Sequence, residues 1–336
     1  AGTTGSASGS GQPGPSSGSA PAASGAAGDA SAVGGYHVVG NQVFDASGKA
    51  HLFHGVDRSS LEFTPTGDHL ALSDYALMAT WKANVVRIAL NQGFWLQGSS
   101  EYSAAYAGIV DQQVKWAESK GLDVILDLHW SDQGNLATKG AQQCMADANS
   151  VTFWQQLAAK YKDDPRVLFE LYNEPHDVSW AVWYGGGQGC GFTVVGMQKL
   201  YDTVRATGAQ NIVIVGGLDY AYQLSGVAAF PIVGKNVMYA THPYNQGSYK
   251  QPNDFDASFG NIAKTYPVII TEFGDQSSAC QTSYYSAVIQ YADAHSLSWT
   301  GWAWYVAGCM YPALISDWGA TPTAAGQIEK AALLSY

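Results

Sequence analysis

The stretch VLFELYNEPH, residues 167–176, decides the fold that the sequence predicts. Its first six residues are a mainly apolar and aromatic run, too short for a helix, which is typical of a buried strand. The run ends at Asn173-Glu174-Pro175, because Pro175 cannot continue a strand ladder. The pattern predicts an amide and a carboxylate at the C-terminal end of a core strand, although the same tripeptide can also simply end a strand.

A second stretch of the same kind, PVIITEFG, occupies residues 267–274 and carries Glu272 at its end. Strand and helix patterns alternate between the two stretches. In a parallel barrel the C-terminal ends of all strands share one face, so Glu174 and Glu272 are expected to point into one cleft. Two carboxylates in a cleft are the groups that cleave a glycosidic bond.

The alternation of strand and helix patterns continues along most of the chain after a small hairpin with its turn at residues 45–48. We predict strands at 52–57, 84–90, 123–130, 167–172, 211–216, 237–244, 268–272 and 298–305. We predict helices at 68–82, 103–120, 150–162, 192–207, 255–265, 283–295 and from 323, with no helix assigned over 221–235. Eight strands with intervening helices predict a single (β/α)₈ (TIM) barrel. A doubly wound sheet would need a Gly-rich phosphate loop after an early strand, and Gly185-Gly186-Gly187 does not fit that pattern.

Residues 1–35 differ from the rest because they are almost entirely Gly, Ser, Ala, Pro and Thr, with Asp29 as the only charge. Such a segment buries too little apolar surface to fold, so we predict a flexible linker, followed by a catalytic domain over residues 36–336. Linkers of this kind join catalytic domains to carbohydrate-binding or anchoring modules, which would lie upstream here. The chain has no initiator Met and no basic-then-apolar leader, so its numbering is expected to start after any signal peptide.

The composition excludes some partners. The 336 residues carry 16 basic and 27 acidic side chains, a net charge of −11, which disfavours nucleic acid and anionic membranes. No apolar run approaches the ~20 residues that span a bilayer. The 11 Trp and 20 Tyr suit a surface that stacks on sugar rings, although packing in the core is expected to account for more than half of them.

The four cysteines, Cys144, Cys190, Cys280 and Cys309, fall in loops after the third, fourth, seventh and eighth predicted strands. None has the spacing of a zinc site. Of the three pairings, Cys144–Cys190 and Cys280–Cys309 are favoured because each joins neighbouring loops on one face; four unrelated thiols are the alternative. Two disulfides indicate an oxidising compartment, so we expect a secreted, extracellular protein.

Eight residues at predicted strand ends give residues 36–336 a resemblance to glycoside hydrolase family 5, in the clan of (β/α)₈ retaining glycosidases. The matching motifs are NVVRI, DLHW, YNEP, HPY, ITEFG and GWAWY. Any one motif is weak evidence, whereas all of them in the family's order are strong evidence. The matching residues are Arg87, His129, Asn173, Glu174, His242, Tyr244, Glu272 and Trp304.

The resemblance implies that Glu174 is the general acid/base and Glu272 the nucleophile. A retaining enzyme needs these carboxyl groups ~5–5.5 Å apart. Arg87 and Tyr244 would keep Glu272 ionised by charge and hydrogen bonding. Glu174 must be protonated to act as an acid, which partial burial and the neighbouring carboxylate should favour.

The remaining residues of the resemblance would bind the sugar. Asn173 is expected to donate to the sugar 2-OH, His129 and His242 to orient hydroxyls and carboxylates, and Trp304 to form the floor of the −1 subsite. The simpler alternatives are an ion pair for Arg87, an interior histidine for His129 and core packing for Trp304.

Other acids and aromatic residues complete the candidate site. Asp127 and Glu170 lie inside predicted strands, so pairing with groups in the barrel interior is expected for them. Tryptophans in loops on the same face as the two glutamates are candidate sugar platforms: Trp95, Trp130, Trp180 and Trp183.

The sequence therefore predicts a secreted retaining endo-β-1,4-glucanase (a cellulase), with a β-linked polysaccharide or oligosaccharide as its partner. We expect a monomer without cofactor or metal. Endo-β-1,4-mannanase or another family 5 activity is the alternative within the enzyme class. A catalytically silent carbohydrate-binding barrel is the alternative from a different class, and a scaffold with structural glutamates is a third.

Overall fold

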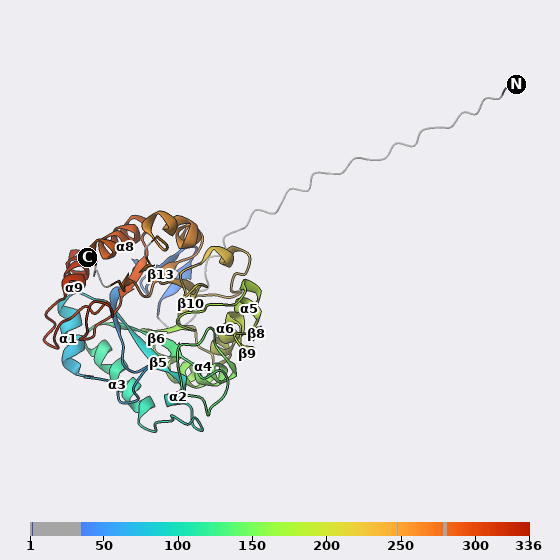
Figure 1. Cartoon of the computed structure of the whole chain (residues 1–336), viewed down its shortest axis with the longest axis horizontal. Helices are drawn as coiled ribbons and strands as arrows, with labels where there is room; N and C mark the ends of the chain where they lie inside the picture. The colour runs from blue at the N-terminus through green and yellow to red at the C-terminus, as the bar shows by residue number, and fades with distance from the viewer. Residues whose placement is uncertain (1, 3–34, 247, 278–280) are drawn as a thin grey trace. The chain divides into compact units, whose positions relative to one another are not determined.

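The computed structural model describes residues 2, 35–246, 248–277 and 281–336. Apart from residues 2 and 35, the predicted linker lies outside the described residues. Within them, eight parallel strands close into a barrel in the order β10-β11-β13-β15-β4-β5-β6-β7 (Figure 1). The strands are β4 (His54–Arg58), β5 (Val85–Asn91), β6 (Asp123–Trp130), β7 (Val167–Glu170), β10 (Val213–Gly216), β11 (Val237–Thr241), β13 (Val268–Ile270) and β15 (Ser298–Gly301). The predicted (β/α)₈ barrel is thus confirmed.

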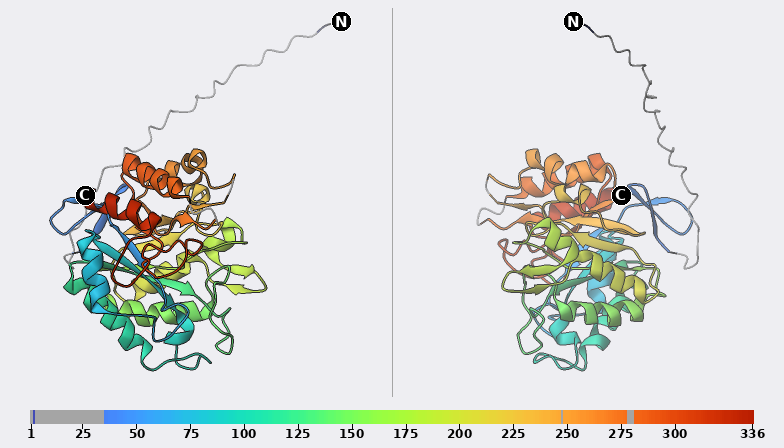
Figure 2. Two further views of the ribbon diagram at one scale, coloured as in Figure 1. Left: turned by 60° about the vertical axis from the view of Figure 1, so that its left-hand side comes forward. Right: turned by 90° about the vertical axis from the view of Figure 1, so that its right-hand side faces the viewer.

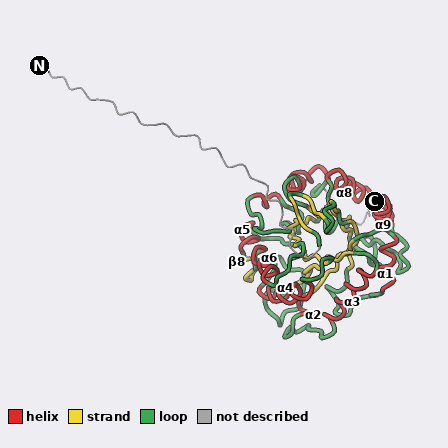
Figure 3. Tube along the Cα trace, turned by 180° about the vertical axis from the view of Figure 1, so that it is seen from behind, coloured by secondary structure: helices red, strands yellow, loops and turns green. Residues whose placement is uncertain are grey.

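Helices surround the barrel strands on the outside (Figure 3). The longer ones are α1 (Leu72–Thr80), α3 (Tyr106–Ser119), α4 (Ala148–Tyr161), α6 (Met197–Ala206), α8 (Thr282–His295) and α9 (Ala324–Ser335). Short helical segments lie in the connections: α2 (Gln92–Trp95), α5 (Trp180–Gly185), η1 (Ser225–Ala228), η2 (Pro252–Asp254), η3 (Asp256–Gly260) and α7 (Asn261–Ala263). No helix among the described residues is long and apolar enough to cross a membrane.

The N-terminal hairpin is part of a three-stranded antiparallel sheet of β1 (His37–Val39), β2 (Gln42–Phe44) and β3 (Ala50–His51). Its predicted turn joins β2 to β3, and the Gly48 amide donates to the Asp45 carbonyl at 2.9 Å. The sheet projects at one end of the barrel (blue in Figure 2). Val43 of this sheet and Phe53 pack against apolar residues of the barrel strands, so the sheet closes the N-terminal end of the barrel.

The interior of the barrel changes from apolar to polar along the strands. Val85, Ile125 and Leu168 belong to the apolar cluster at the N-terminal end. Two residues further along the same strands come Arg87, Asp127 and Glu170 of β5, β6 and β7, all fully buried. Side chains two apart point to the same side of a strand, so these three face the barrel interior as well. The polar layer lies next to the C-terminal ends of the strands, which we call the barrel mouth.

Some predicted elements are shorter or divided. The stretch predicted as a helix over 192–207 forms β9 (Phe192–Val194), which pairs with β8 (Gly187–Gly189), and then α6. The strand predicted over 237–244 divides into β11 and β12 (Tyr244–Asn245), and β12 pairs in parallel with β14 (Gly274–Asp275). Tyr244 is therefore presented by a short strand beyond the barrel itself, and His242 by the connection that leads to it.

Candidate active site

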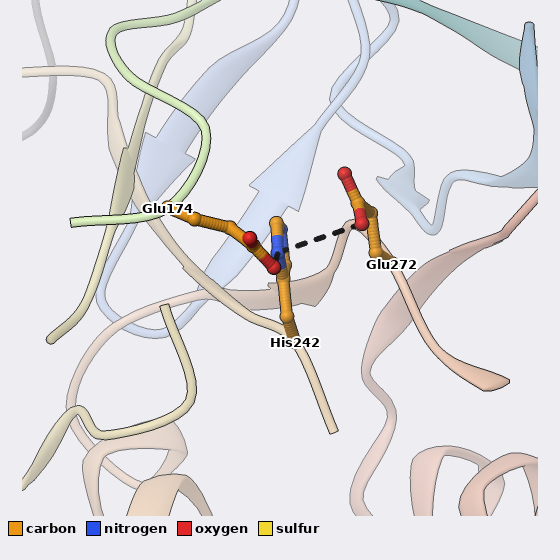
Figure 4. Close-up of side chains that lie close together, drawn as sticks. All are labelled: Glu174, His242 and Glu272. Carbon is orange, nitrogen blue, oxygen red and sulfur yellow. Dashed lines mark hydrogen bonds and ion pairs between the residues drawn. The ribbon is translucent and has the colours of Figure 1, made fainter. Parts of the chain in front are cut away.

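Glu174 and Glu272 approach each other at the barrel mouth. Glu174 follows β7 by four residues and Glu272 follows β13 by two, while His242 directly follows β11. One carboxylate oxygen of each glutamate and a ring nitrogen of His242 all lie within 4.8 Å of one another, with the imidazole between the carboxylates (Figure 4). These three groups have the donor atoms and spacing to hold a metal ion. However, a guanidinium beside Glu272 would repel a second cation there.

Glu272 is held by two buried donors. Nη1 of Arg87 lies 2.7 Å from its Oε1, and the Tyr244 hydroxyl donates to its Oε2 at 2.8 Å. All three side chains are buried. A positive charge and a hydrogen bond both favour the ionised form of a carboxyl group, so this arrangement suits a carboxylate that acts as a nucleophile.

Arg87 also contacts the other acids of the polar layer. Its guanidinium lies 2.5 Å from Glu170, 3.0 Å from Asp127 and 3.4 Å from Asp57, and it donates to the Asn173 side-chain carbonyl at 2.7 Å. Burial raises the pKa of Asp57 and of Asp127 well above the ordinary value, against the opposing charge of Arg87. For Glu170 burial acts in the same direction, but the charges and hydrogen bonds of Arg87 and His242 together outweigh it and lower the pKa to about 2. Asp127 and Glu170 thus pair inside the barrel, as their positions within strands predicted.

Glu174 is held by donors from two loops. Nδ1 of His242 lies 3.1 Å from its Oε1, and the Gln142 amide donates to its Oε2. The other ring nitrogen of His242, Nε2, lies 2.9 Å from the Thr271 hydroxyl, which donates to Glu170 at 2.8 Å. His242 is therefore fixed on both sides, with Nδ1 directed at Glu174.

The charges around this pair favour a protonated imidazole and an ionised Glu174. Burial lowers the pKa of His242, but the negative charge of Glu272, the Glu170 carboxylate 3.9 Å away and the hydrogen bond to Glu174 together outweigh burial and raise the pKa to about 10. Burial raises the pKa of Glu174, but the hydrogen bond and charge of His242 outweigh burial and lower it. We expected burial and the neighbouring carboxylate to keep Glu174 protonated. The direction differs because the cationic imidazole of His242 lies directly against Glu174 and stabilises its ionised form.

Asn173 and His129 form a chain of hydrogen bonds beside the two glutamates. The Asn173 amide nitrogen lies 3.3 Å from Nε2 of His129, and Nδ1 of His129 lies 2.6 Å from Asp127. Burial lowers the pKa of His129 and so favours the neutral ring. Because the Asn173 carbonyl accepts from Arg87, its amide group is oriented with the nitrogen directed away from that cation.

Trp304 does not lie where the sequence placed it. Its side chain is 1% exposed and packs against Trp81 in the main core, with ring centroids 4.8 Å apart. This burial contradicts the expectation that Trp304 forms the floor of the −1 subsite. The indole at the mouth belongs to Trp302, which stacks on His129 at 5.4 Å with an interplanar angle of 16°. The motif GWAWY contains both tryptophans, and its letters alone do not say which one faces the core.

The four tryptophans predicted as sugar platforms fall into two groups, buried and half-buried. Trp183 is fully buried and donates to the Gly216 carbonyl, and Trp95 is buried against Tyr106 and Phe153, so both belong to the core and the expectation is wrong for them. Trp95 lies in α2 and Trp183 in α5, short helices that pack against longer ones, so apolar burial outweighs exposure of an indole. Two of the four are half-buried and remain candidates: Trp130 and Trp180.

The disulfide Cys144–Cys190 is present and spans 46 residues. It joins the loop after β6 to the turn between β8 and β9, and the Cys144 carbonyl accepts from the His176 amide at 2.9 Å. It therefore fastens the segment that carries Gln142 to the chain that follows Glu174. The predicted Cys280–Cys309 pair includes Cys280, which lies outside the described residues.

A closed (β/α)₈ barrel with two adjacent carboxylates at its mouth defines a glycoside hydrolase of the retaining class. Residues 45–308 match the family model described as Cellulase (glycosyl hydrolase family 5). The chain belongs to glycoside hydrolase family 5, which confirms the resemblance seen in its motifs.

Relatives and solved structures agree with this assignment. The chain is 26% identical over 332 residues to an endoglucanase of Paenibacillus polymyxa, covering 82% of this chain and 80% of that protein. It is 25% identical over 282 residues to Endoglucanase E-5 of Thermobifida fusca, covering 79% of this chain but only 54% of that protein. A crystal structure of a β-glucanase from Saccharophagus degradans in complex with cellotetraose superposes with a TM-score of 0.72 at 26% identity, covering 90% of this chain and 93% of that one.

Proposed function

We propose that the protein is an endo-β-1,4-glucanase that cleaves cellulose or related β-glucans by double displacement, with Glu272 as nucleophile and Glu174 as general acid/base. The observation that carries this proposal is the separation of the two carboxylates, whose nearest oxygens lie within 4.8 Å. Retaining glycosidases hold these groups ~5–5.5 Å apart, whereas inverting enzymes leave ~6.5–9.5 Å for a water molecule.

In the first step Glu272 attacks the anomeric carbon while the bond to the leaving oxygen breaks and Glu174 gives that oxygen a proton. The imidazole of His242, 3.1 Å from Glu174, is the source of this proton. In the second step a water molecule gives its proton to Glu174 and attacks the glycosyl-enzyme, Glu272 leaves as a carboxylate, and the proton passes from Glu174 back to His242. Arg87 and Tyr244 contact Glu272 throughout and stabilise the charge that it regains.

The choice of glucan as substrate is supported by the relatives, which are named endoglucanases, and by the β-glucanase that holds cellotetraose. A mannanase remains the alternative, since the residues around the cleaved bond do not select distal sugars. A silent carbohydrate-binding barrel is disfavoured, because binding alone does not need a buried carboxylate paired with Arg87 beside a second one bound by His242.

We further propose that the protein is secreted and acts as a monomer. The Cys144–Cys190 disulfide supports an oxidising compartment. The composition of residues 1–35 supports a linker to an upstream carbohydrate-binding or anchoring module. Size-exclusion chromatography with light scattering measures the oligomeric state, and a dimer would contradict this part of the proposal.

A substrate panel tests the activity. Carboxymethylcellulose, lichenan, glucomannan, mannan and xyloglucan are each assayed for reducing ends and for viscosity, with Glu272→Gln as the inactive control. We expect the highest activity on β-1,4-glucan and a fall in viscosity that precedes the release of most reducing ends, because endo cleavage shortens chains quickly. Mannan as the best substrate would select the alternative, and binding without cleavage would select the silent barrel.

A further inference from the structure

Thr271 links His242 to a second carboxylate inside the barrel. It lies between β13 and Glu272 in the chain, and its side chain is fully buried. Its hydroxyl donates to Oε1 of Glu170 at 2.8 Å and lies 2.9 Å from Nε2 of His242. Nδ1 of the same imidazole lies 3.1 Å from Oε1 of Glu174. A continuous chain of hydrogen bonds therefore runs from Glu174 through the imidazole and the hydroxyl to Glu170.

The direction of each hydrogen bond in this chain follows from Glu170. Nε of Arg87 donates to its Oε2 at 2.5 Å, and with its pKa lowered to about 2 Glu170 is ionised and only accepts hydrogen bonds. A hydroxyl has one hydrogen, and Thr271 gives it to Glu170 because a hydrogen bond to a charged acceptor is the stronger one. The oxygen of Thr271 therefore faces His242 with a lone pair, and Nε2 of the imidazole must carry a hydrogen.

A hydrogen fixed on Nε2 decides which nitrogen of His242 exchanges a proton, because the hydrogen bond at one ring nitrogen sets the protonation of the other. When the cationic ring gives the hydrogen on Nδ1 to Glu174, the neutral ring that remains keeps its hydrogen on Nε2. Its lone pair on Nδ1 then faces Glu174 at 3.1 Å and can take a proton back. The opposite tautomer would have a hydrogen on Nδ1 and could not accept a proton there.

We propose that Thr271 is a positioning residue for the acid/base step. Its hydroxyl, oriented by Glu170, holds His242 in the tautomer that exchanges a proton through Nδ1 alone. In the first step the proton passes from Nδ1 to Glu174 and from Glu174 to the leaving oxygen. In the second step the proton of the attacking water returns to Nδ1 by the same route, while Thr271 itself gains and loses no proton. This inference rests on the proposed role of Glu174 as acid/base.

Two substrates that differ in their need for a proton test this role. Phenyl β-cellobioside needs protonation of its leaving oxygen, whereas dinitrophenyl β-cellobioside does not, and kcat/KM reports the first step for both. Thr271→Val removes the hydroxyl and keeps the branched side chain. We expect kcat/KM to fall about 10- to 100-fold on the phenyl substrate, a typical loss on removing an orienting partner, and to stay near the wild-type value on the dinitrophenyl substrate. Thr271→Ser keeps the hydroxyl and should behave as the wild type on both.

Thr241→Val is the matched control. Thr241 is equally buried and directly precedes His242, but its hydroxyl donates to the Tyr222 carbonyl at 2.9 Å. The ratio of its two kcat/KM values should equal that of the wild type, and this ratio does not depend on how much of the protein has folded. In Thr271→Val, an equal loss on both substrates, or no loss, would overturn the inference. A loss in Thr271→Ser as large as in Thr271→Val would overturn it as well.

A measurement on the wild type decides the matter if Thr271→Val does not fold. Above the pKa of about 10 of His242 the ring is neutral, and ¹⁵N NMR identifies its protonated nitrogen, with His242→Gln to assign the signals. We expect the hydrogen on Nε2, and a hydrogen on Nδ1 would overturn the inference. Glu174→Ala should show the same dependence on the leaving group as Thr271→Val. If it does not, or if the wild type cleaves neither cellobioside nor any polymer of the panel, the proposed function fails instead, so the two failures are distinguishable.

Discussion

Nδ1 of His242 lies 3.1 Å from Oε1 of Glu174, and this hydrogen bond places a cationic imidazole directly against the proposed acid/base. The same nitrogen is 3.8 Å from Oε2 of Glu272. The imidazole of His242 therefore holds a proton between Glu174 and Glu272. In the proposed reaction these two carboxyl groups must differ in ionisation. The proposed mechanism then requires only a short proton transfer from His242 to Glu174 as charge builds on the leaving oxygen.

The roles of the two glutamates can be separated by azide. Glu272→Ala removes the nucleophile, so every substrate should lose activity, and azide should restore turnover with an α-configured glycosyl azide by attack from the emptied side. Glu174→Ala should spare the first step for a dinitrophenyl glycoside, whose leaving group needs no proton. Azide should then accelerate the second step and give the β-configured product. NMR of the two products is the measurement.

The wild-type product is the control for that experiment, because a retaining enzyme releases the β-anomer first. Identical configurations of the azide adducts from both variants would mean that the two roles are misassigned.

The contribution of His242 to stability should depend on pH. Its pKa is raised to about 10 in the folded protein, so its stabilisation is complete below its unfolded value of about 6.5 and is lost as the pH rises towards 10. The difference in the free energy of unfolding between wild type and His242→Gln should therefore shrink from pH 7 to pH 10. Urea unfolding at each pH measures it.

His54→Gln is the control for the same series. Burial lowers the pKa of His54 to about 4, so both its folded and its unfolded values lie below this window. Its stability difference should stay flat from pH 7 to pH 10. A flat curve for His242→Gln as well would contradict a cationic imidazole at the site.

Replacing Arg87 should strongly destabilise the protein. Arg87→Gln leaves Glu170 and Glu272 buried without their cation, and breaking a buried ion pair in this way costs about 3–5 kcal/mol. Arg166→Gln is the matched control: Arg166 also pairs with an aspartate, Asp123 at 2.8 Å, but its side chain is 34% exposed, so about 1 kcal/mol or less is expected. Equal losses in urea unfolding would argue against the buried network.

Substitution of Trp302 should mainly lower activity, whereas substitution of Trp304 should mainly lower stability. Trp304→Ala opens a cavity against Trp81 and should cost about 3–5 kcal/mol of unfolding free energy. Trp302→Ala removes the ring stacked on His129. The bound sugar should then be less well oriented for attack, so kcat/KM should fall about 100-fold, whereas the loss of stability should be smaller than for Trp304→Ala. Parallel thermal melts and kinetics measure both, and the reverse pattern would restore Trp304 as the subsite floor.

The Cys144–Cys190 disulfide should stabilise the loops that carry Gln142 and the chain after Glu174. A crosslink over 46 residues restricts the unfolded chain by about 4 kcal/mol. The double variant Cys144→Ser/Cys190→Ser should lose up to this amount in urea unfolding. Thiol counting in the denatured, unreduced wild type also tests the second predicted pair, Cys280–Cys309. Two or more free thiols would disprove the full pairing.

The sequence by itself determined the barrel and the position of its two glutamates. Strand periodicity and the stop at Pro175 are local properties, and in a parallel barrel every strand end lies at the same face. This is why Glu174 and Glu272 could be assigned to one site from two separate stretches. The eight-residue resemblance then supplied the family, which the match over residues 45–308 confirms.

Only the tertiary structure decided what surrounds those glutamates. Gln142 reaches Glu174 from another loop, and the proton lies on His242 because three carboxylates converge on one imidazole, which no local pattern records. Trp302 faces the mouth and Trp304 the core because the direction of each indole is set by long-range packing, here against Trp81 and His129. Direction and ionisation are properties of contacts between distant segments, and those contacts exist only once the chain has folded.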